Sequence, residues 1–448
     1  MGGSRRFWTR LGLITLGAAV WRVWYVVGPV MSRIPKLGLD DEFFYSAQAR
    51  LVADGKGFLN PFGYFAPAGS PAHRVFPTAV HPPLYTVFLA VPAKLGLSTP
   101  QEQRIFTALL GTATVLLIGV LGRKLAGDRA GLLAAAVAAV YPALWVNDAM
   151  LGLETLYGFL VILALLAFYR LWKAPTMANA ALFAACLSLA TLARSEGAML
   201  FVLFALPTLI LLPRVATRDR LKLFGVVVAV ALVIVGPWAV RNVTTFEKPT
   251  LLGNGFGWVL LYGSCDAAFS GTHLGYWDDS CALKDYPPAT EESVLDQMAR
   301  TKAFDYLGNH KGRVPVVVAA RIGRIWDVFR PFQNVEFNDT SERRGHVASW
   351  AVLIGYWLIM PFAIFGLVVL RRRRIPIFPY LAIALSVTIT VALSFGITRY
   401  RAPVDTVLPV LAAVGIDAIW RRYRPSPSRA IDGQAVARQP VPMETAAS

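Results

Sequence analysis

Three consecutive carboxylates, Asp40, Asp41 and Glu42, follow directly after the first long apolar segment of the chain. Carboxylates are costly beside lipid unless they face water or a binding site. The residues from Tyr45 onward have helical character, so Asp41 and Tyr45 should lie one turn apart on one helix face. A carboxylate held in this way could act as a general base that takes a proton from a hydroxyl group. It could equally be an acidic cap at the start of a surface helix.

Two further groups could serve the same chemistry. His81 precedes Pro82 and Pro83, which can begin a helix; it could bind a phosphate, hold an acceptor or be structural. Glu154 is followed at once by an apolar span, and an ionisable group at membrane depth favours a functional role. It could orient the acceptor or a cation bound to phosphate, or simply cap its helix.

Several arginines lie at the ends of apolar segments that we place, with these acids, at the outer face of the membrane. Positive charge usually gathers at the cytoplasmic face, so each of these arginines needs a partner. Arginine binds phosphate oxygens through paired hydrogen bonds and keeps its charge at a membrane surface. The alternative is that each arginine reaches lipid headgroups or pairs with a nearby acid, as Arg194 could with Glu196. The arginines are Arg194, Arg241, Arg399 and Arg401.

The cysteines point to one covalent link. Cys265 and Cys281 both fall in a long loop that we place outside the membrane, where a disulfide can persist. Cys186 falls in an apolar segment and should be a small buried residue. Three cysteines are too few for a disulfide framework or a four-cysteine zinc site, and we predict no metal ligands.

The composition indicates a membrane protein. The chain has 448 residues, of which 56% are hydrophobic and only 16% charged, and its mean hydropathy is +0.52. These values exclude a disordered chain and disfavour a soluble enzyme. The net charge of +17 does not indicate nucleic acid, because the lysines and arginines form short clusters between apolar segments.

We expect about ten membrane spans, the first with its N-terminus inside. With this arrangement the basic clusters at short loops all fall on one side, which we take as cytoplasmic. Residues 84–97 then lie as a helix on the outer surface, and Val314 to Arg330 form an amphipathic helix in a long outer loop. Besides the first, the spans are 105–122, 130–147, 151–169, 177–193, 197–213, 223–240, 350–370, 376–396 and 403–420.

The chain therefore divides into six parts by span and loop. The predicted parts are a basic N-terminus and first span (1–31), a first outer loop with surface helices (32–103), a helix bundle (104–241), a long outer loop domain (242–349), C-terminal spans (350–420) and a disordered cytoplasmic tail (421–448).

Several blocks resemble the GT-C glycosyltransferases, in particular the protein O-mannosyltransferase and lipid A aminoarabinose transferase families. The blocks occur in family order across about residues 11–420, although the long outer loop matches only loosely. Leu192 to Gly197 resembles a pattern written T-R-P-E, with Ser195 in place of proline. The other blocks are Asp41-Glu42 with Phe44-Tyr45, Ala49-Arg50 and Gly55-Lys56-Gly57-Phe58; His81-Pro82-Pro83-Leu84-Tyr85; Leu153-Glu154-Thr155-Leu156; Pro237 to Asn242; and Arg399-Tyr400-Arg401-Ala402-Pro403.

The resemblance implies an all-α, GT-C-type membrane bundle with a lipid-facing cleft, and a sugar donor carried on polyprenyl phosphate. Asp41 maps to the family's base, with Asp40 able to replace it, and Glu154 to its second acid. Arg241 and Arg401 would neutralise the departing phosphate. The chain lacks Asp-x-Asp in the first loop, so we expect no required cofactor, although some relatives use a divalent cation. The other residues assigned to substrate binding are Glu42, Tyr45, His81, Arg194, Glu196 and Arg399.

The predicted function is inverting transfer of a sugar to an acceptor hydroxyl on a lipid, polysaccharide or protein, at the outer face of a bacterial plasma membrane, with both termini cytoplasmic. Alternatives are a lipid-linked sugar transporter or flippase, an oligosaccharide ligase and a non-catalytic scaffold. A transporter should show inverted repeats or broken helices at mid-membrane, whereas the charges here gather at the outer ends of spans.

Overall fold

The computed structural model describes residues 2–34, 37–38, 40–287 and 290–423, and these residues form helices and loops with no β-strand. The predicted all-α class is confirmed. Most of the predicted tail, from residue 424 onward, lies outside the described residues. The helices are α1 (Gly2–Tyr25), η1 (Val26–Val30), α2 (Met31–Arg33), α3 (Asp41–Ala53), α4 (Pro61–Tyr64), α5 (Leu84–Lys94), α6 (Pro100–Ala126), α7 (Asp128–Val140), α8 (Pro142–Asp148), α9 (Glu154–Lys173), α10 (Met177–Ala193), η2 (Ser195–Ala198), η3 (Phe201–Ala205), α11 (Leu206–Leu211), α12 (Thr217–Thr245), α13 (Phe256–Tyr262), α14 (Asp266–Phe269), η4 (Asp279–Cys281), α15 (Glu292–Asn309), α16 (Val314–Ile325), α17 (Pro331–Thr340), α18 (His346–Arg372), α19 (Phe378–Leu393), η5 (Thr398–Arg401) and α20 (Ala402–Tyr423).

Within the described residues, six helical stretches are long and apolar enough to cross a membrane. The bent pair α7 and α8, broken at Tyr141, makes a seventh if it counts as one span. The remaining three predicted segments are also helical, but α10, Ser195–Leu211 and α19 are shorter. The structure therefore supports a multi-pass membrane protein, and the count of ten spans stays a prediction.

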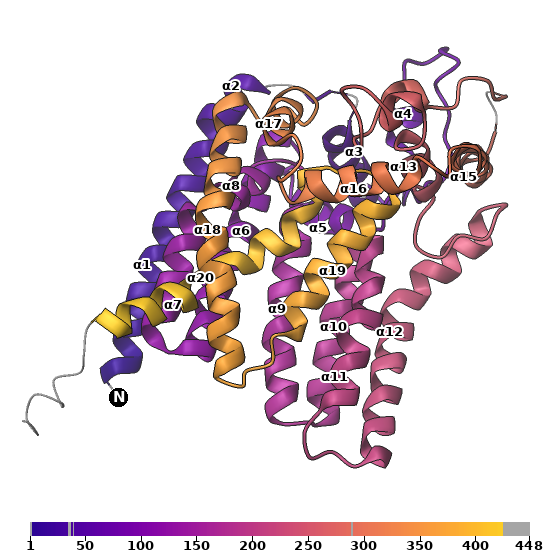
Figure 1. The fold of residues 1–448 in the computed structure, drawn as a ribbon. Coiled ribbons are helices and arrows are strands. Elements are labelled where there is room, and N and C mark those ends of the chain that lie inside the picture. Colours follow the sequence, from indigo (N-terminus) through magenta and orange to yellow (C-terminus); the bar gives the residue numbers. More distant parts are fainter. Residues whose placement is uncertain (1, 35–36, 39, 288–289, 424–448) are drawn as a thin grey trace, which may run out of the picture.

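The helix bundle has two different ends (Figure 1). One end, which we call the loop end, carries α3, α4, α5 and the helices α13 to α17. The other, which we call the short-turn end, holds the turns between α6 and α7, α9 and α10, α11 and α12, and α18 and α19. The basic clusters at those turns thus share one end, as the sequence predicts, and the acidic block that begins α3 is at the other.

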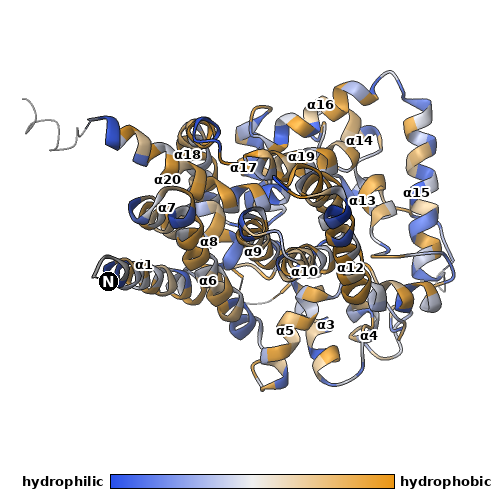
Figure 2. Cartoon of the chain, turned by 90° about the horizontal axis from the view of Figure 1, so that it is seen from below, coloured by the Kyte–Doolittle hydropathy of each residue, from blue (hydrophilic) through white to orange (hydrophobic). Residues whose placement is uncertain are grey.

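The bundle is held together by close contacts between helices with small residues. A Cβ atom on Gly131 of α7 would lie 2.6 Å from the carbonyl oxygen of Gly119 on α6, so only glycine permits this approach. α20 is buried over most of its length, whereas α12 is mostly exposed. Figure 2 shows apolar residues along the bundle helices and hydrophilic residues along α15, which lies at the periphery.

All the predicted domain boundaries fall inside helices, about one turn from the nearest helix end. For example, α12 continues to Thr245, past the predicted boundary at 241. Composition locates the apolar part of a span, but the polar residues that flank it continue the helix. The predicted helix from Val314 to Arg330 is also shorter, because α16 ends at Ile325 and the backbone of Asp327 enters the left-handed region (φ 51°).

Candidate active site

A cavity of about 670 Å³ opens at the loop end of the bundle. Its walls come from the start of α3, the residues before α5, the start of α9, η2, the segment from Leu251 to Tyr262, the end of α19 and η5. One part of the lining is charged and another is apolar and aromatic. The charged and hydroxyl-bearing residues among those predicted from the sequence are Asp41, Tyr45, His81, Glu154, Arg194, Glu196 and Arg399.

The start of α3 places Asp41 and Tyr45 on the cavity wall. Asp40 caps the helix, since its side chain accepts a hydrogen bond from the backbone N–H of Phe43 at 3.2 Å. Asp41 is therefore free of capping and is the first helical residue, and Tyr45 follows one turn later. Within the acidic block, Asp40 is therefore the helix cap and Asp41 faces the cavity, where its role as a general base stays a prediction.

Arg399 joins three carboxylates that are far apart in the sequence. Its guanidinium lies 2.9 Å from Asp41, 3.3 Å from Glu154 and 3.3 Å from Glu342. Arg194 lies 3.4 Å from Glu154 and 3.3 Å from Glu196. These contacts form one network, in which Glu154 is shared by both arginines. The local pair predicted between Arg194 and Glu196 is present, but it is only part of that network.

The charges around Asp41 keep it ionised. Desolvation in the cavity wall raises the pKa of Asp41, but the charge of Arg399 and the nearby imidazole of His81, whose Nε2 lies 3.7 Å from the carboxylate, outweigh that effect. The pKa of Asp41 therefore lies well below its usual range. Its side chain is still 42% exposed and can be reached from the cavity. A proton acceptor at this position is thus charged and accessible, although Arg399 must be drawn away before it becomes strongly basic.

Tyr45 adds a hydroxyl group to the same wall. Burial and the nearby charge of Asp41 raise the pKa of Tyr45 well above its usual value, so the group stays protonated. Its hydroxyl is buried and has no hydrogen-bond partner within the described part of the chain. A buried hydroxyl without a partner is costly, and it can be satisfied by a ligand in the cavity.

The wall that carries His81 is fixed by a buried carboxylate that sequence reasoning missed. Glu292, at the start of α15, accepts hydrogen bonds from the Thr78 hydroxyl (2.6 Å), the Ala79 N–H (2.8 Å) and the Asn254 amide (3.1 Å). Burial raises the pKa of Glu292. Asn254 belongs to the segment from Leu251 to Tyr262, and its own N–H donates to the Ala79 carbonyl oxygen (2.8 Å), so Glu292 joins two neighbouring segments of the cavity wall.

Four predicted substrate-binding residues lie outside the cavity lining. Asp40 pairs with Arg343 (3.0 Å), and Glu42 pairs with Arg104 (2.7 Å) and accepts from the N–H of Leu151. The structure thus gives both acids protein partners on elements around the site. Their predicted contacts with substrate stay untested.

The other two are arginines. Arg241 donates to the carbonyl oxygens of Thr78 (3.1 Å) and Phe58 (3.3 Å), so it supports the His81 wall from behind. Arg401 is fully buried and lies 2.7 Å from Asp327 and 3.2 Å from Asp405. In this arrangement Arg399, and not Arg401, presents its charge to the cavity. A phosphate role for either of these two arginines remains a prediction.

Glu342 and the disulfide complete the surroundings. Glu342 lies in the charged run from Ser341 to Arg344, in which no spacing marks it for a site. Only the fold brings it to Arg399. Cys265 and Cys281 form a disulfide with their Cα atoms 5.6 Å apart, and Cys186 is a buried free cysteine.

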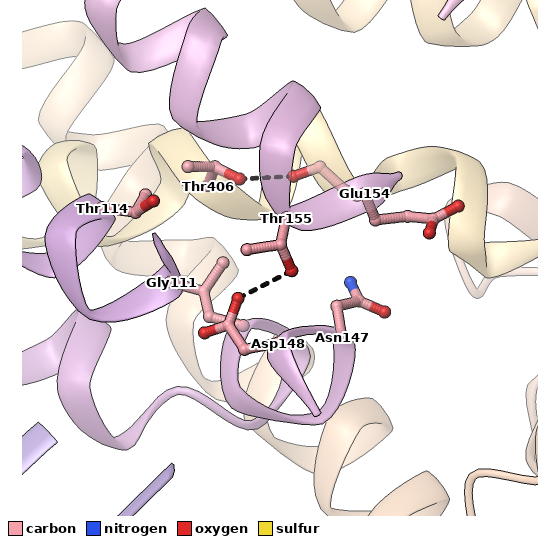
Figure 3. Close-up of a pocket in the computed structure, with 9 residues that line it drawn as sticks. Gly111, Thr114, Asn147, Asp148, Glu154, Thr155 and Thr406 are labelled. Atoms are coloured by element: carbon pink, nitrogen blue, oxygen red, sulfur yellow. Dashed lines mark hydrogen bonds between the residues drawn. The ribbon is translucent and has the colours of Figure 1, made fainter. Parts of the chain in front are cut away.

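A second, very small pocket lies beside the main cavity (Figure 3). Here Asp148 accepts a hydrogen bond from Thr155 (2.9 Å) and pairs with Arg22 (2.7 Å), while Glu154 points away from it. A Cβ atom on Gly111 would come within 2.3 Å of the Asp148 carboxylate, so this approach requires glycine. The pocket, about 10 Å³, has room for about one water molecule. Its contacts fix the turn that presents Glu154.

Among the residues described, no three histidine, cysteine or acidic side chains come together in a way that could hold a metal ion. The three acids that line the cavity, Asp41, Glu154 and Glu196, are each paired with an arginine. The residues present thus do not fit a divalent cation in this arrangement.

Comparison with known proteins agrees with the sequence motifs. Residues 80–240 match the family model described as dolichyl-phosphate-mannose-protein mannosyltransferase. The apo oligosaccharyltransferase of Archaeoglobus fulgidus aligns at a TM-score of 0.53 and 15% identity, covering 97% of this chain and 53% of its own. The chain has a GT-C-type fold. The resemblance to GT-C glycosyltransferases is therefore confirmed, and no curated protein matches the chain.

One further structure has a similar fold, and another aligns more weakly. The oligosaccharyltransferase AglB from Archaeoglobus fulgidus, in complex with an inhibitory peptide and a dolichol-phosphate, aligns at a TM-score of 0.52 and 14% identity, with 98% of this chain and 53% of that one covered. ArnT from Cupriavidus metallidurans bound to undecaprenyl phosphate aligns at a TM-score of 0.40, which is too low to establish a common fold. Its sequence identity is 16%, and the alignment covers 91% of this chain and 78% of ArnT. The chain spans about half the length of the oligosaccharyltransferase.

Proposed function

We propose that this protein is a glycosyltransferase that moves a sugar from a polyprenyl-phosphate donor to an acceptor hydroxyl, with inversion, at the outer face of a bacterial plasma membrane. The observation that carries the proposal is the meeting of Asp41 with Arg399 and Arg194 in one cavity that is charged on one side and apolar on the other. The family match over residues 80–240 supports the same chemistry.

In the proposed reaction, the Asp41 carboxylate takes the proton of the acceptor hydroxyl. The acceptor oxygen then forms a bond to the anomeric carbon as the bond from that carbon to the phosphate oxygen breaks. The polyprenyl phosphate leaves with both bonding electrons and gains negative charge, which arginines stabilise. The attack from the opposite face inverts the anomeric centre.

The network around Arg399 suggests how donor and base communicate. Arg399 is shared by Asp41, Glu154 and Glu342. A donor phosphate would compete for the same guanidinium, because arginine binds phosphate through two parallel hydrogen bonds. Losing this partner would raise the pKa of Asp41 and make it a better base when the donor is present. Tyr45 and His81, on the same wall, would hold the sugar or the acceptor.

The test is transfer from a panel of radiolabelled polyprenyl-phosphate sugars, both single sugars and oligosaccharides, by protein in membranes. The Asp41→Asn variant should lose about 10²–10⁴-fold in rate, the range expected for loss of a general base. Asp40→Asn is the matched control, since Asp40 caps α3 and lies outside the cavity lining.

The outcomes separate the alternatives. Equal consumption of donor by wild type and Asp41→Asn, at equal protein levels, would remove Asp41 as the base. A loss confined to Asp40→Asn would move the role to its neighbour. If wild type consumes no donor in the panel, the enzyme proposal fails and a transporter or scaffold function is favoured.

A further inference from the structure

The helix α16 buries both its arginines and part of its apolar side, and it exposes only small and apolar residues. Its two arginines, Arg321 and Arg324, point inward and are 3% and 0% exposed. The exposed side consists of small and apolar residues, with Val316 46% exposed and Pro315 and Ala319 also exposed. A helix in water would bury such residues and expose its arginines. The sequence led us to expect charged and apolar faces, but not that the charged face would be the buried one.

The buried arginines bind the main chain of neighbouring elements. Arg321 donates to the carbonyl oxygens of Ala392 (3.0 Å) and Gly263 (2.5 Å). Ala392 is in the last turn of α19, whose final carbonyl groups have no partners within their own helix. α16 therefore packs against the loop end of α19; Figure 1 shows it roughly perpendicular to the long helices, and Figure 2 shows it at the edge of the bundle.

The length of α19 places this contact at the edge of the hydrocarbon layer. α19 has 16 residues, so it is about 24 Å long, whereas the layer is about 30 Å thick. If α19 reaches the opposite surface at its basic short-turn end, its other end lies inside the layer or at its boundary. A helix packed across that end, with apolar residues outward, is then within reach of lipid.

The loop that follows α16 extends the same surface along a span. Val328 is 78% exposed and Phe332 is 61% exposed. The ring of Phe332 lies 5.6 Å from that of Trp350 and 6.3 Å from that of Trp357, both on α18. Trp357 is eleven residues into α18, or about 16 Å along the span. Phe332 therefore lies beside the first turns of α18, between the levels of Trp350 and Trp357.

We propose that the exposed residues of this segment, Pro315, Val316, Ala319, Val328 and Phe332, form an interfacial foot that rests in the acyl and glycerol region of the lipid leaflet at the loop end. The occupant is lipid because the foot continues the exposed apolar face of a span, where Ile354 is 49% and Leu358 is 67% exposed. Exposed cations before the foot (Lys311) and within its stretch of sequence (Arg330) suit phospholipid headgroups.

The test measures lipid contact directly and does not depend on activity. Single cysteines are introduced into a Cys186→Ala background, in which the remaining pair is disulfide-bonded. Val316→Cys and Val328→Cys carry the probe on the foot. Leu358→Cys is the lipid control on α18, and Phe304→Cys, 54% exposed on the polar helix α15, is the water control. Each is labelled with an NBD fluorophore in phosphatidylcholine–phosphatidylglycerol nanodiscs, with and without lipid doxylated at carbon 5.

We expect doxyl lipid to quench the foot labels at least half as much as the label at Leu358→Cys, and to leave the label at Phe304→Cys unchanged. Quenching at the foot no greater than at Phe304→Cys would overturn the proposal. Labels shielded from both doxyl lipid and aqueous iodide would also overturn it, since a protein partner would then cover the foot. If Val316→Cys fails to fold, Val328→Cys decides alone, because its side chain is the more exposed.

Discussion

Arg399 and Arg401 stand two residues apart, yet their replacement should have very different effects on stability. Arg401 is fully buried, pairs with Asp327 and Asp405, and lies 3.5 Å from the centre of the Tyr356 ring. Changing Arg401 to glutamine leaves two buried carboxylates without a cation, which should destabilise the fold by about 3–5 kcal/mol.

The same change at Arg399 should cost no more than about 2 kcal/mol. Arg399 is 27% exposed and its partner Asp41 is 42% exposed, so water replaces part of the lost interaction. Glu154 also keeps Arg194 as a partner. Of its three carboxylates only Glu342, 10% exposed, is left buried without an ion pair.

The assay is unfolding by sodium dodecyl sulfate in mixed micelles, followed by tryptophan fluorescence. A variant that joins Arg401→Gln with Asp327→Asn and Asp405→Asn is the matched control. It should recover most of the loss, because the cost comes from uncompensated charge. Equal stability of Arg401→Gln and Arg399→Gln would refute this reasoning, as would a triple variant no more stable than Arg401→Gln.

Three other predictions concern stability. Glu292→Ala should lower the free energy of unfolding by about 2–4 kcal/mol because three hydrogen-bond donors lose their acceptor. Glu292→Gln keeps an amide that can satisfy them and should lose less. Equal losses of the two variants in chemical unfolding would contradict the role of Glu292 in holding the cavity wall. Asp41 has a lowered pKa, so its stabilising contribution is present above about pH 4 and is lost as the pH falls further. Between pH 7 and pH 3 the melting temperature should therefore fall slightly more in wild type than in Asp41→Asn. The corresponding difference in unfolding free energy should stay below about 1 kcal/mol, because the Asp41 side chain is 42% exposed. Reduction of the disulfide between Cys265 and Cys281, which are 16 residues apart, should destabilise the fold by about 3 kcal/mol. A Cys265→Ser/Cys281→Ser variant should melt at the temperature of the reduced protein and should not respond to dithiothreitol. If dithiothreitol leaves the melting temperature of wild type unchanged, the disulfide contributes nothing to stability.

The sequence predicts the parts of this molecule that depend on local pattern. Long apolar segments and basic turns locate the helices of the bundle and its two ends. The acidic block at Asp41 and the acid at Glu154 could be selected because charge directly beside an apolar segment is unusual. The structure brings both into one cavity with Arg194 and Arg399.

What the sequence could not show depends on contacts between distant segments. Glu292 and Glu342 lie in polar stretches where an acid is ordinary, and only folding brings them to Thr78 and to Arg399. The sequence also cannot distinguish the roles of Arg399 and Arg401, because both belong to the four-residue helix η5. Only the folded position of η5 decides which of the two faces the cavity. Buried arginines on α16 are unexpected because many of their partners are main-chain carbonyl oxygens, which no residue type in the sequence identifies.

The network at Arg399 also has a consequence for how the protein is made. Asp41 is synthesised 358 residues before Arg399, and Glu154 and Glu342 also precede it. Arg399 stands at the start of the segment that continues into α20, so the cation shared by these three acids arrives only when that helix enters the bundle. Until then Arg194 can pair with Glu154, but Asp41 and Glu342 lack the arginine that joins them in the complete structure. Completion of the charge network is therefore one of the last steps of assembly, and a chain arrested before α20 has the acids of the site without the arginine that joins them.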